Sequence, residues 1–167
     1  MIRNVKISDA KAISDIYNYH VYNTIVTFDL EPTSVTQMEQ TISRVTEKHP
    51  WFVVEENNEI VGYAYASYWK KRSAYNATVE SSIYISEKHI GKGIGKDLYQ
   101  HLLRTLIQQN IHIIIGGISL PNKASVVLHE KFGFKKVAHF KEVGFKFNKW
   151  IDVGYWQLTI DSTIKNI

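Results

Sequence analysis

The chain has 167 residues, of which 44% are hydrophobic and 22% are charged, and its formal net charge is +4. This length and composition predict a single globular domain with one substantial core. The chain contains no cysteine, which excludes disulfide bonds, thiol catalysis and cysteine-ligated metal sites.

The charge and hydropathy patterns narrow the kind of partner. The sequence has no run of about 18 apolar residues and no signal-peptide pattern, so we expect a cytoplasmic protein without a membrane partner. Basic residues are scattered, apart from residues 70–72 and the pair Lys92 and Lys96. A nucleic-acid-binding face usually has a longer basic stripe, so a small anion is the better prediction for a ligand.

The N-terminal part of the chain predicts one strand and two helices. Residues 1–20 begin as a short strand and continue as a helix capped by Ser8 or Asp9. A second capped helix is predicted over residues 34–48.

The next segments predict a hairpin and a third strand. Residues 51–69 form two apolar stretches around Asn57 and Asn58, which are typical turn residues. Residues 76–86 predict a strand that ends just before a glycine-rich loop.

The second half predicts two helices and three strands. These elements are a helix from near Gly93, a strand buried on both faces at 111–120, a short helix at 122–132, and strands at 133–145 and 148–160. The order β-α-α-β-β-β-α-β-α-β-β is that of an α/β domain with a mixed sheet. We expect the domain to span residues 1–160, with residues 161–167 as a C-terminal tail.

The glycine-rich loop HIGKGIGKDL at residues 89–98 does not fit two common nucleotide motifs. A P-loop needs four residues between its first glycine and Gly-Lys, then Ser or Thr. Here three residues separate Gly91 from Gly95, and no Ser or Thr follows Lys96. A dinucleotide fingerprint needs G-x-G-x-x-G early in a βαβ unit, whereas this G-x-G-x-G lies in mid-chain.

Two interpretations of the loop remain open from its residues alone. A pyrophosphate could bind at the helix N-terminus near Gly93, attracted by free N–H groups, the helix dipole and the charge of Lys92 or Lys96. Alternatively, the loop is a tight strand-to-helix turn that binds nothing.

Together with a second motif, the loop resembles the GNAT acetyltransferase superfamily. The loop glycines lie in IGKGIG, and LPNKASVVLHEKFGF follows the next strand. In that second motif Asn122, His129 and Gly133–Phe134 match the family's spacing. The resemblance extends over essentially the whole chain.

Four sequence blocks make the resemblance more specific. They are TFDLEP, KKRSAYNATVESSIYIS, SLPNKASVVLHEKFGF and GFKFNKWIDVGYWQL. In this order they are similar to the phosphinothricin and methionine sulfone N-acetyltransferases. The resemblance implies a single-domain GNAT fold whose mixed, mostly antiparallel sheet is flanked by helices.

Glu80 is the candidate general base. Strand alternation gives the segment TVESSIYI two faces: Val79, Ser81, Ile83 and Ile85 on one, and Thr78, Glu80, Ser82 and Tyr84 on the other. Periodicity alone favours a solvent-facing glutamate, whereas the resemblance places the catalytic base at Glu80. A base is useful because an amine is mostly protonated at neutral pH.

His129 is the second catalytic candidate. Most GNAT enzymes have a tyrosine at this spacing, and the resemblance implies that histidine is typical of the phosphinothricin branch. His129 could act as an acid, act as a second base, orient the substrate, or be a packed structural residue.

The resemblance implies an acetyl-CoA site on the glycine loop and the adjacent strand. Its expected residues are Ile83, Tyr84, Ile85, Gly91, Lys92, Gly93, Ile94, Gly95, Lys96 and Asn122. Ile90 stands where the family usually has Arg or Gln, so backbone and lysines would hold the phosphates. Gly116 and Gly117 are expected to leave space for the cofactor, or to form a simple bulge.

The resemblance also implies a site for an acidic amino acid. Its expected residues are Phe28, Lys70, Lys71, Arg72, Tyr75, Ser81 and Ser82. Arg72 offers a planar fork that suits a carboxylate or phosphinate, and Lys70 offers a point charge. From the residues alone, this basic segment could equally be a solvated turn.

The expected function is transfer of an acetyl group from acetyl-CoA to the α-amine of a small amino acid, without a metal. The candidates for the acceptor are phosphinothricin, methionine sulfone and methionine sulfoximine, and the expected assembly is a homodimer. The alternatives are a GNAT enzyme for a protein N-terminus, a polyamine or an aminoglycoside, and a non-catalytic acetyl-CoA-binding module. A nucleic-acid binder is disfavoured because aromatic and basic residues are not interleaved.

Overall fold

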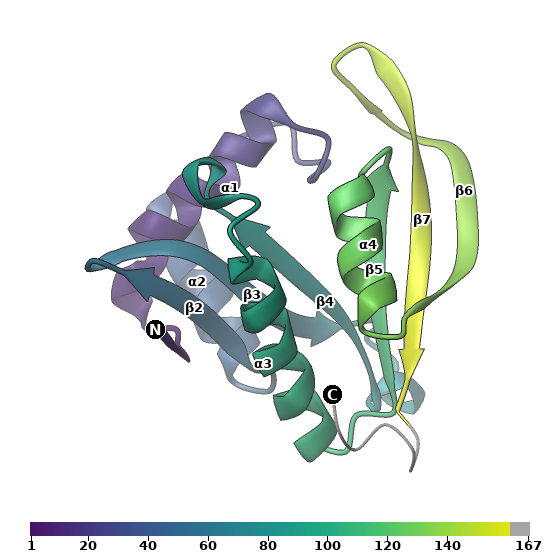
Figure 1. The fold of residues 1–167 in the computed structure, drawn as a ribbon, viewed down its shortest axis with the longest axis horizontal. Helices are drawn as coiled ribbons and strands as arrows, with labels where there is room; N and C mark the ends of the chain where they lie inside the picture. The colour runs from purple at the N-terminus through teal and green to yellow at the C-terminus, as the bar shows by residue number, and fades with distance from the viewer. Residues whose placement is uncertain (161–167) are drawn as a thin grey trace.

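The computed structural model describes residues 1–160, so the expected tail at 161–167 lies outside the described residues. The elements follow the predicted order (Figure 1). The helices are α1 (Ala10–Asn23), α2 (Val35–Thr46), α3 (Ile94–Gln108) and α4 (Lys123–Lys131). The strands are β1 (Ile2–Asn4), β2 (Trp51–Glu56), β3 (Glu59–Tyr68), β4 (Thr78–Ile85), β5 (Ile113–Leu120), β6 (Lys135–Lys146) and β7 (Lys149–Thr159).

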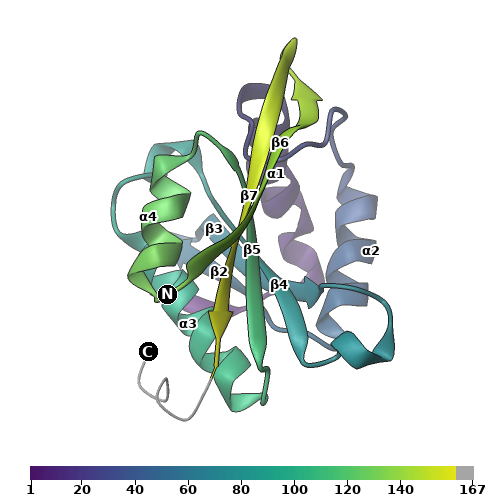
Figure 2. The same cartoon turned by 90° about the vertical axis from the view of Figure 1, so that its right-hand side faces the viewer.

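The seven strands form one sheet in the order β1-β2-β3-β4-β5-β7-β6. The pair β4–β5 is parallel and the other pairs are antiparallel, which confirms a mixed, mostly antiparallel sheet. Helices α1 and α2 cover one face, and α3 and α4 cover the other (Figure 2). In the described part of the chain, no helix is both long and apolar enough to span a bilayer.

Strand alternation divides the apolar residues between two cores. In β2, Trp51 and Val53 pack with α1 and α2, whereas Phe52 and Val54 pack with α3. The strand at residues 113–120 has buried residues on both faces, as its apolar sequence predicts.

Of two predicted helix caps, Ser34 makes a side-chain capping bond and Asp9 does not. Ser34 caps α2 in a capping box with Gln37, as the sequence predicts. Asp9 occupies the N-cap of α1 without a side-chain capping bond. Its carboxylate instead binds the Arg3 guanidinium through two hydrogen bonds of 2.7 and 2.9 Å and accepts the N–H of Lys6.

The sheet opens between β4 and β5. The two strands pair only through Thr78–Ile113, Val79–Ile114 and Glu80–Ile115, and they then diverge (Figure 1). Beyond Ile115, β5 continues to pair with β7 on its other side. The split exposes edges of both strands in the middle of the domain.

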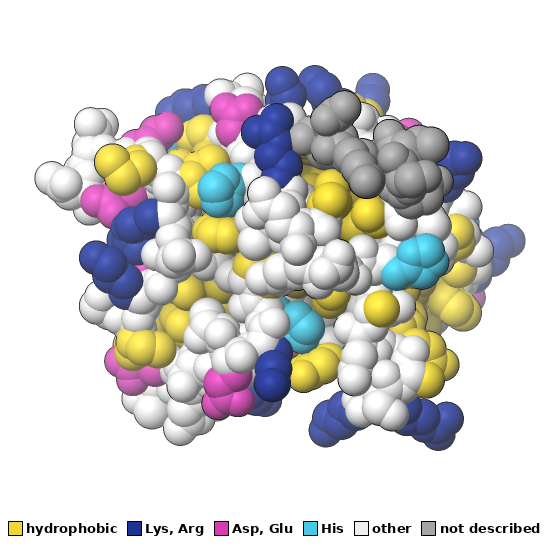
Figure 3. All heavy atoms as spheres, turned by 90° about the horizontal axis from the view of Figure 1, so that it is seen from below, with side chains coloured by type: hydrophobic (Ala, Val, Ile, Leu, Met, Phe, Trp, Pro, Cys, Tyr) yellow, Lys and Arg dark blue, Asp and Glu magenta, His cyan; other side chains and the backbone are white. Residues whose placement is uncertain are grey.

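Charged side chains are mixed on the face at the lower end of the molecule. In Figure 3, lysine and arginine side chains on this face are scattered among acidic and apolar ones. This distribution agrees with the scattered basic residues of the sequence.

Candidate active site

A cavity lies where β4 and β5 separate. Its wall is formed by residues 80–84 of β4, residues 117–119 of β5, three residues of the α4 region and one of the α1–α2 loop, namely Asn122, Ser125, His129 and Val26. Larger hollows open beside α1 and α2, but neither Glu80 nor His129 lines them.

Glu80 enters this cavity from the sheet face that carries α1 and α2. It lies beside Gly117 of β5, where an added Cβ would be 3.1 Å from Glu80 Oε1 and 3.2 Å from the Tyr155 ring. Burial raises the pKa of the Glu80 carboxyl, and the charge of Lys70 lowers it. A carboxylate with a raised pKa beside a single cation is suited to accepting a proton near neutral pH.

His129 approaches the same cavity from the opposite face. Its side chain is 4% exposed and packs edge-on against Phe134 and at a tilt against Tyr99. Nδ1 lies 2.8 Å from the carbonyl oxygen of Ser125. Because a carbonyl oxygen can only accept, Nδ1 carries a hydrogen, and the neutral ring has its lone pair on Nε2. Burial lowers the pKa of His129, which favours this neutral form.

Two adjacent glycines of β5 make room for these side chains. A Cβ at Gly116 would lie 2.5 Å from His129 Nε2, and Gly117 faces Glu80. These contacts give a reason for glycine at both positions that the sequence did not predict. The two glycines let Glu80 and His129 close in on β5 from its two sides.

Hydrogen-bond register shows which backbone groups of β4 face the opening. The Ser86 N–H donates to Val61 O at 2.9 Å, so the pair Ile85–Gly62 is of the non-hydrogen-bonded type. The alternating pattern then pairs Tyr84 with Tyr63 through both of its backbone groups. Ile83 and Ile85, rather than Tyr84, direct their backbone groups toward the opening.

His20 of α1 contacts one of these backbone groups, the carbonyl oxygen of Ile85. Its Nε2 lies 3.1 Å from Ile85 O, and its side chain is 5% exposed. This contact leaves the Ile83 N–H and C=O and the Ile85 N–H on the open edge. These groups could pair with an extended ligand as an added strand would.

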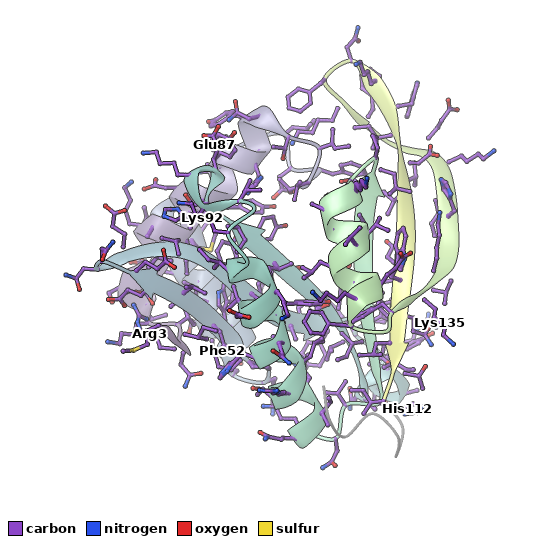
Figure 4. The ribbon with its side chains drawn as sticks, in the orientation of Figure 1. Arg3, Phe52, Glu87, Lys92, His112 and Lys135 are labelled. Atoms are coloured by element: carbon purple, nitrogen blue, oxygen red, sulfur yellow. The ribbon has the colours of Figure 1, made fainter. Side chains whose placement is uncertain are left out.

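The glycine loop has the backbone of an anion site. Gly91 and Gly93 have φ of 82° and 85°, and Gly93 is the N-cap of α3. Within the described chain, the N–H groups of residues 91–95 have no backbone acceptor, whereas Lys96 N–H donates to Gly93 O. Lys92 lies in the loop that leads into α3 (Figure 4). Free N–H groups at a helix start, with exposed lysines nearby, fit a pyrophosphate.

Among residues 1–160, the Asn122 side chain is hydrogen-bonded through one of its two polar ends. Its Oδ1 accepts the N–H of Ser125 at 3.1 Å and caps α4. The amide NH₂ remains available to a ligand in the cavity that Asn122 lines. Loop, open strand edge and Asn122 together fit the shape of an extended, pyrophosphate-bearing cofactor.

A family model described as an acetyltransferase (GNAT) domain matches residues 2–154. The chain belongs to the GNAT acetyltransferase family.

Relatives and solved structures agree with this assignment. Phosphinothricin N-acetyltransferase of Streptomyces viridochromogenes is 37% identical over 156 residues, which cover 93% of this chain and 85% of that protein. The L-methionine sulfoximine/L-methionine sulfone acetyltransferase of Salmonella typhimurium is 33% identical over 161 residues, covering 96% and 94%. A GNAT superfamily phosphinothricin acetyltransferase from Sinorhizobium meliloti, solved with acetyl-CoA, has a TM-score of 0.93 and 32% identity over 96% of this chain and 88% of its own.

Of the expected substrate residues, Lys70 and Ser82 lie near Glu80. The charge of Lys70 acts on Glu80, and Ser82 shares the face of Glu80 and lies opposite Tyr65 of β3. Ser81 lies on the other face, where its hydroxyl is 2.7 Å from the Tyr99 hydroxyl and donates to Ile115 O. Ser81 therefore belongs to the interior beside α3 rather than to the face of Glu80.

The other expected substrate residues do not line the cavity that Glu80 enters. Lys71 and Arg72 are exposed, and Tyr75 is 40% exposed in the short 3-10 turn η2 (Ser73–Tyr75). Phe28 lies in the loop between α1 and α2, where its ring packs on Gly144.

Sequence reasoning missed two aromatic residues in the neighbourhood of Glu80, Tyr155 and Trp69. Trp69 packs edge-on against Tyr155 at a ring separation of 5.4 Å. The Tyr155 ring and the Glu80 carboxylate both lie beside Gly117. No motif identifies Tyr155, because its approach to Glu80 depends on the pairing of β7 with β5. Trp69 precedes Lys70 directly, and its ring lies 4.8 Å from Lys70 Nζ.

Proposed function

We propose that this GNAT enzyme transfers the acetyl group of acetyl-CoA to the α-amine of a small amino acid with an acidic or sulfonyl-type side chain. The observation that carries the proposal is the cavity in the split sheet, which Glu80 enters from one face and His129 from the other. Phosphinothricin, methionine sulfone and methionine sulfoximine are the proposed acceptors, in line with the names of the relatives.

Acetyl-CoA is proposed to bind along the face that carries α3 and α4. Residues 91–96 would hold its pyrophosphate through backbone N–H groups and through Lys92 and Lys96. The open groups of Ile83 and Ile85 would pair with the pantetheine arm, and Asn122 would donate from its free NH₂. A backbone N–H of this strand would stabilise the developing oxyanion. No metal is part of the proposal.

Glu80 is proposed as the general base. The amine must lose a proton as it attacks the thioester, and the Glu80 carboxylate accepts that proton through a water molecule. The absence of cysteine means that the amine attacks directly, without a cysteinyl acyl-enzyme.

His129 is proposed to orient the reacting amine or its water. In the neutral form its Nε2 accepts a hydrogen bond and cannot donate one, because Nδ1–H is held by Ser125 O. His129 can therefore protonate the departing thiolate only after it has itself taken up a proton. This order favours acceptor and positioning roles over a first role as an acid.

Lys70, Lys71, Arg72, Tyr75, Ser82 and Phe28 are proposed to bind the amino acid. Lys70 has the strongest support, because its charge already acts on Glu80. A basic segment at this site favours an anionic acceptor over a polyamine or an aminoglycoside, which would need carboxylates.

The test is release of free CoA thiol from acetyl-CoA with each acceptor separately. We expect turnover with phosphinothricin, methionine sulfone and methionine sulfoximine, and none with spermidine, an aminoglycoside or a short peptide. Turnover with spermidine or the peptide alone would contradict the acceptor class. Tight acetyl-CoA binding without turnover in any sample would instead indicate a binding module.

We also propose that the enzyme is cytoplasmic and forms a homodimer. The exposed apolar residues of the β6–β7 hairpin support the dimer: Val137, Phe140, Val143, Phe145, Phe147 and Trp150.

A further inference from the structure

Three contacts hold the α1–α2 loop against β5 and β6, which lie across the split from β4. Ser119 Oγ, at the end of β5, donates to Ile25 O. Lys146 Nζ, at the end of β6, donates to Thr27 O at 2.8 Å. The Phe28 ring lies on Gly144 of β6. These contacts join segments that are more than 90 residues apart in the sequence.

Gly144 is a glycine because of Phe28, not because of its backbone. Its φ is not in the left-handed region, unlike those of Gly91, Gly93 and Gly133. A Cβ at Gly144 would overlap the Phe28 ring, with Cζ at 2.6 Å and Cδ2 at 2.7 Å. Real Cβ atoms do not approach other atoms this closely, so Phe28 would have to move.

Lys146 strengthens the same attachment. Its side chain is 4% exposed, and its ammonium lies 5.1 Å from the centre of the Phe147 ring as well as on Thr27 O. Burial lowers the pKa of Lys146, while the nearby charge of Asp29 raises it. A buried ammonium needs such partners, so the loop carbonyl and Lys146 depend on each other.

Val26 connects the attached loop with the wall of the cavity. Val26 lies between the two fastened carbonyls, of Ile25 and Thr27, and lines the cavity that contains Glu80. Because Phe28 lies two residues from Val26, we expect displacement of Phe28 to change the position of Val26 in the cavity wall.

We propose that Gly144 is a specificity-determining residue: by admitting the Phe28 ring, the end of β6 fixes the wall against which the acceptor amine fits. This inference rests on the proposed acetyltransferase activity. The edge strand β6 would thus influence which acceptors fit the cavity, because it holds the α1–α2 loop that forms part of the cavity wall.

The first test is a double-mutant cycle of Gly144→Ala and Phe28→Ala, with Lys141→Ala as the control at an exposed nearby position of β6. We expect Gly144→Ala to raise the acceptor KM about tenfold and to leave the acetyl-CoA KM unchanged. In the Phe28→Ala background, Gly144→Ala should add no further increase. An unchanged acceptor KM, or an effect that persists without Phe28, would overturn the proposal.

The second measurement is independent of activity. Hydrogen exchange of residues 24–30 should be faster in Gly144→Ala than in the wild type and in Lys141→Ala. In the Phe28→Ala background, Gly144→Ala should cause no such increase. Unaltered exchange would refute the attachment. An inactive wild-type protein whose exchange follows this pattern would refute the proposed function alone.

Discussion

Glu80 and His129 show how burial favours the neutral form of each side chain. Burial raises the pKa of Glu80 and lowers that of His129, because each site disfavours the charged form. A carboxylate with a raised pKa is a stronger base, and a neutral imidazole presents a lone pair. The same desolvation thus prepares both side chains to accept protons or hydrogen bonds.

Replacing Glu80 by glutamine tests the base directly. We expect Glu80→Gln to lower kcat/KM by about 100- to 10,000-fold with unchanged acetyl-CoA affinity. In the wild type, the rate should rise with pH as Glu80 ionises, at a pH above the ordinary glutamate pKa of about 4.3; in Glu80→Gln that rise should be absent.

Stability separates this catalytic effect from damage to the fold. Folding disfavours the Glu80 carboxylate, so Glu80→Gln should be at least as stable as the wild type at neutral pH. Glu59→Gln, at an exposed position of β3, is the matched control and should keep full activity. Equal pH–rate profiles of Glu80→Gln and the wild type would rule out Glu80 as the base.

At the scale of elements, the start of α3 depends on two left-handed glycines. Gly91 and Gly93 have open space where a Cβ would lie, so sterics do not require glycine there. Their positive φ does, because an L-residue pays about 1–2 kcal/mol in this conformation. The backbone turn in which they lie aims the free N–H groups of the loop outward.

Replacing Gly93 by alanine should therefore weaken acetyl-CoA binding. We expect Gly93→Ala to raise the acetyl-CoA Kd about tenfold, as 1–2 kcal/mol of strain moves the loop. Isothermal titration with acetyl-CoA measures this directly. Gly133→Ala carries the same strain at a φ of 86° beyond α4, and should lower stability without changing the Kd. Equal losses of affinity in the two variants would argue against a phosphate site on the loop.

At the scale of the whole molecule, one sheet supports two cores and separates in the middle. The two cores lie on opposite faces of the sheet, and the core beside α3 joins both sides of the split, since it contains Val79 of β4 and its partner Ile114 of β5. Burial of polar groups accompanies this arrangement. His20, His49 and His129 all have pKa values lowered by burial.

These histidines predict that stability falls in mild acid. The unfolded chain takes up their protons near the ordinary pKa of about 6.5, before the folded chain does, so stability is lost as the pH falls below that value. We expect a melting temperature a few degrees lower at pH 5.5 than at pH 7.5, and a smaller difference in His20→Gln. His112→Gln, at an exposed position, is the control. A melting temperature independent of pH over this range would contradict the prediction.

Local patterns in the sequence determined the elements and much of the candidate site. Alternation in residues 78–85 placed Glu80 and Ser82 on one face and Ser81 on the other, because successive strand residues point to opposite sides. The turn at Asn57 and Asn58 is confirmed, and both residues have positive φ. These features depend on neighbours a few residues apart, so they can be inferred from the sequence alone.

Contacts between distant segments were decided only by the tertiary structure. The sequence gives no sign that Gly116 faces His129, that Tyr155 approaches Glu80 or that Phe28 rests on Gly144. Each contact depends on strand order and register, which set residues far apart in the chain side by side. The same register pairs Tyr84 with Tyr63 and leaves Ile83 on the open edge. Sequence periodicity determines the face on which a side chain lies, whereas strand register determines what lies opposite it.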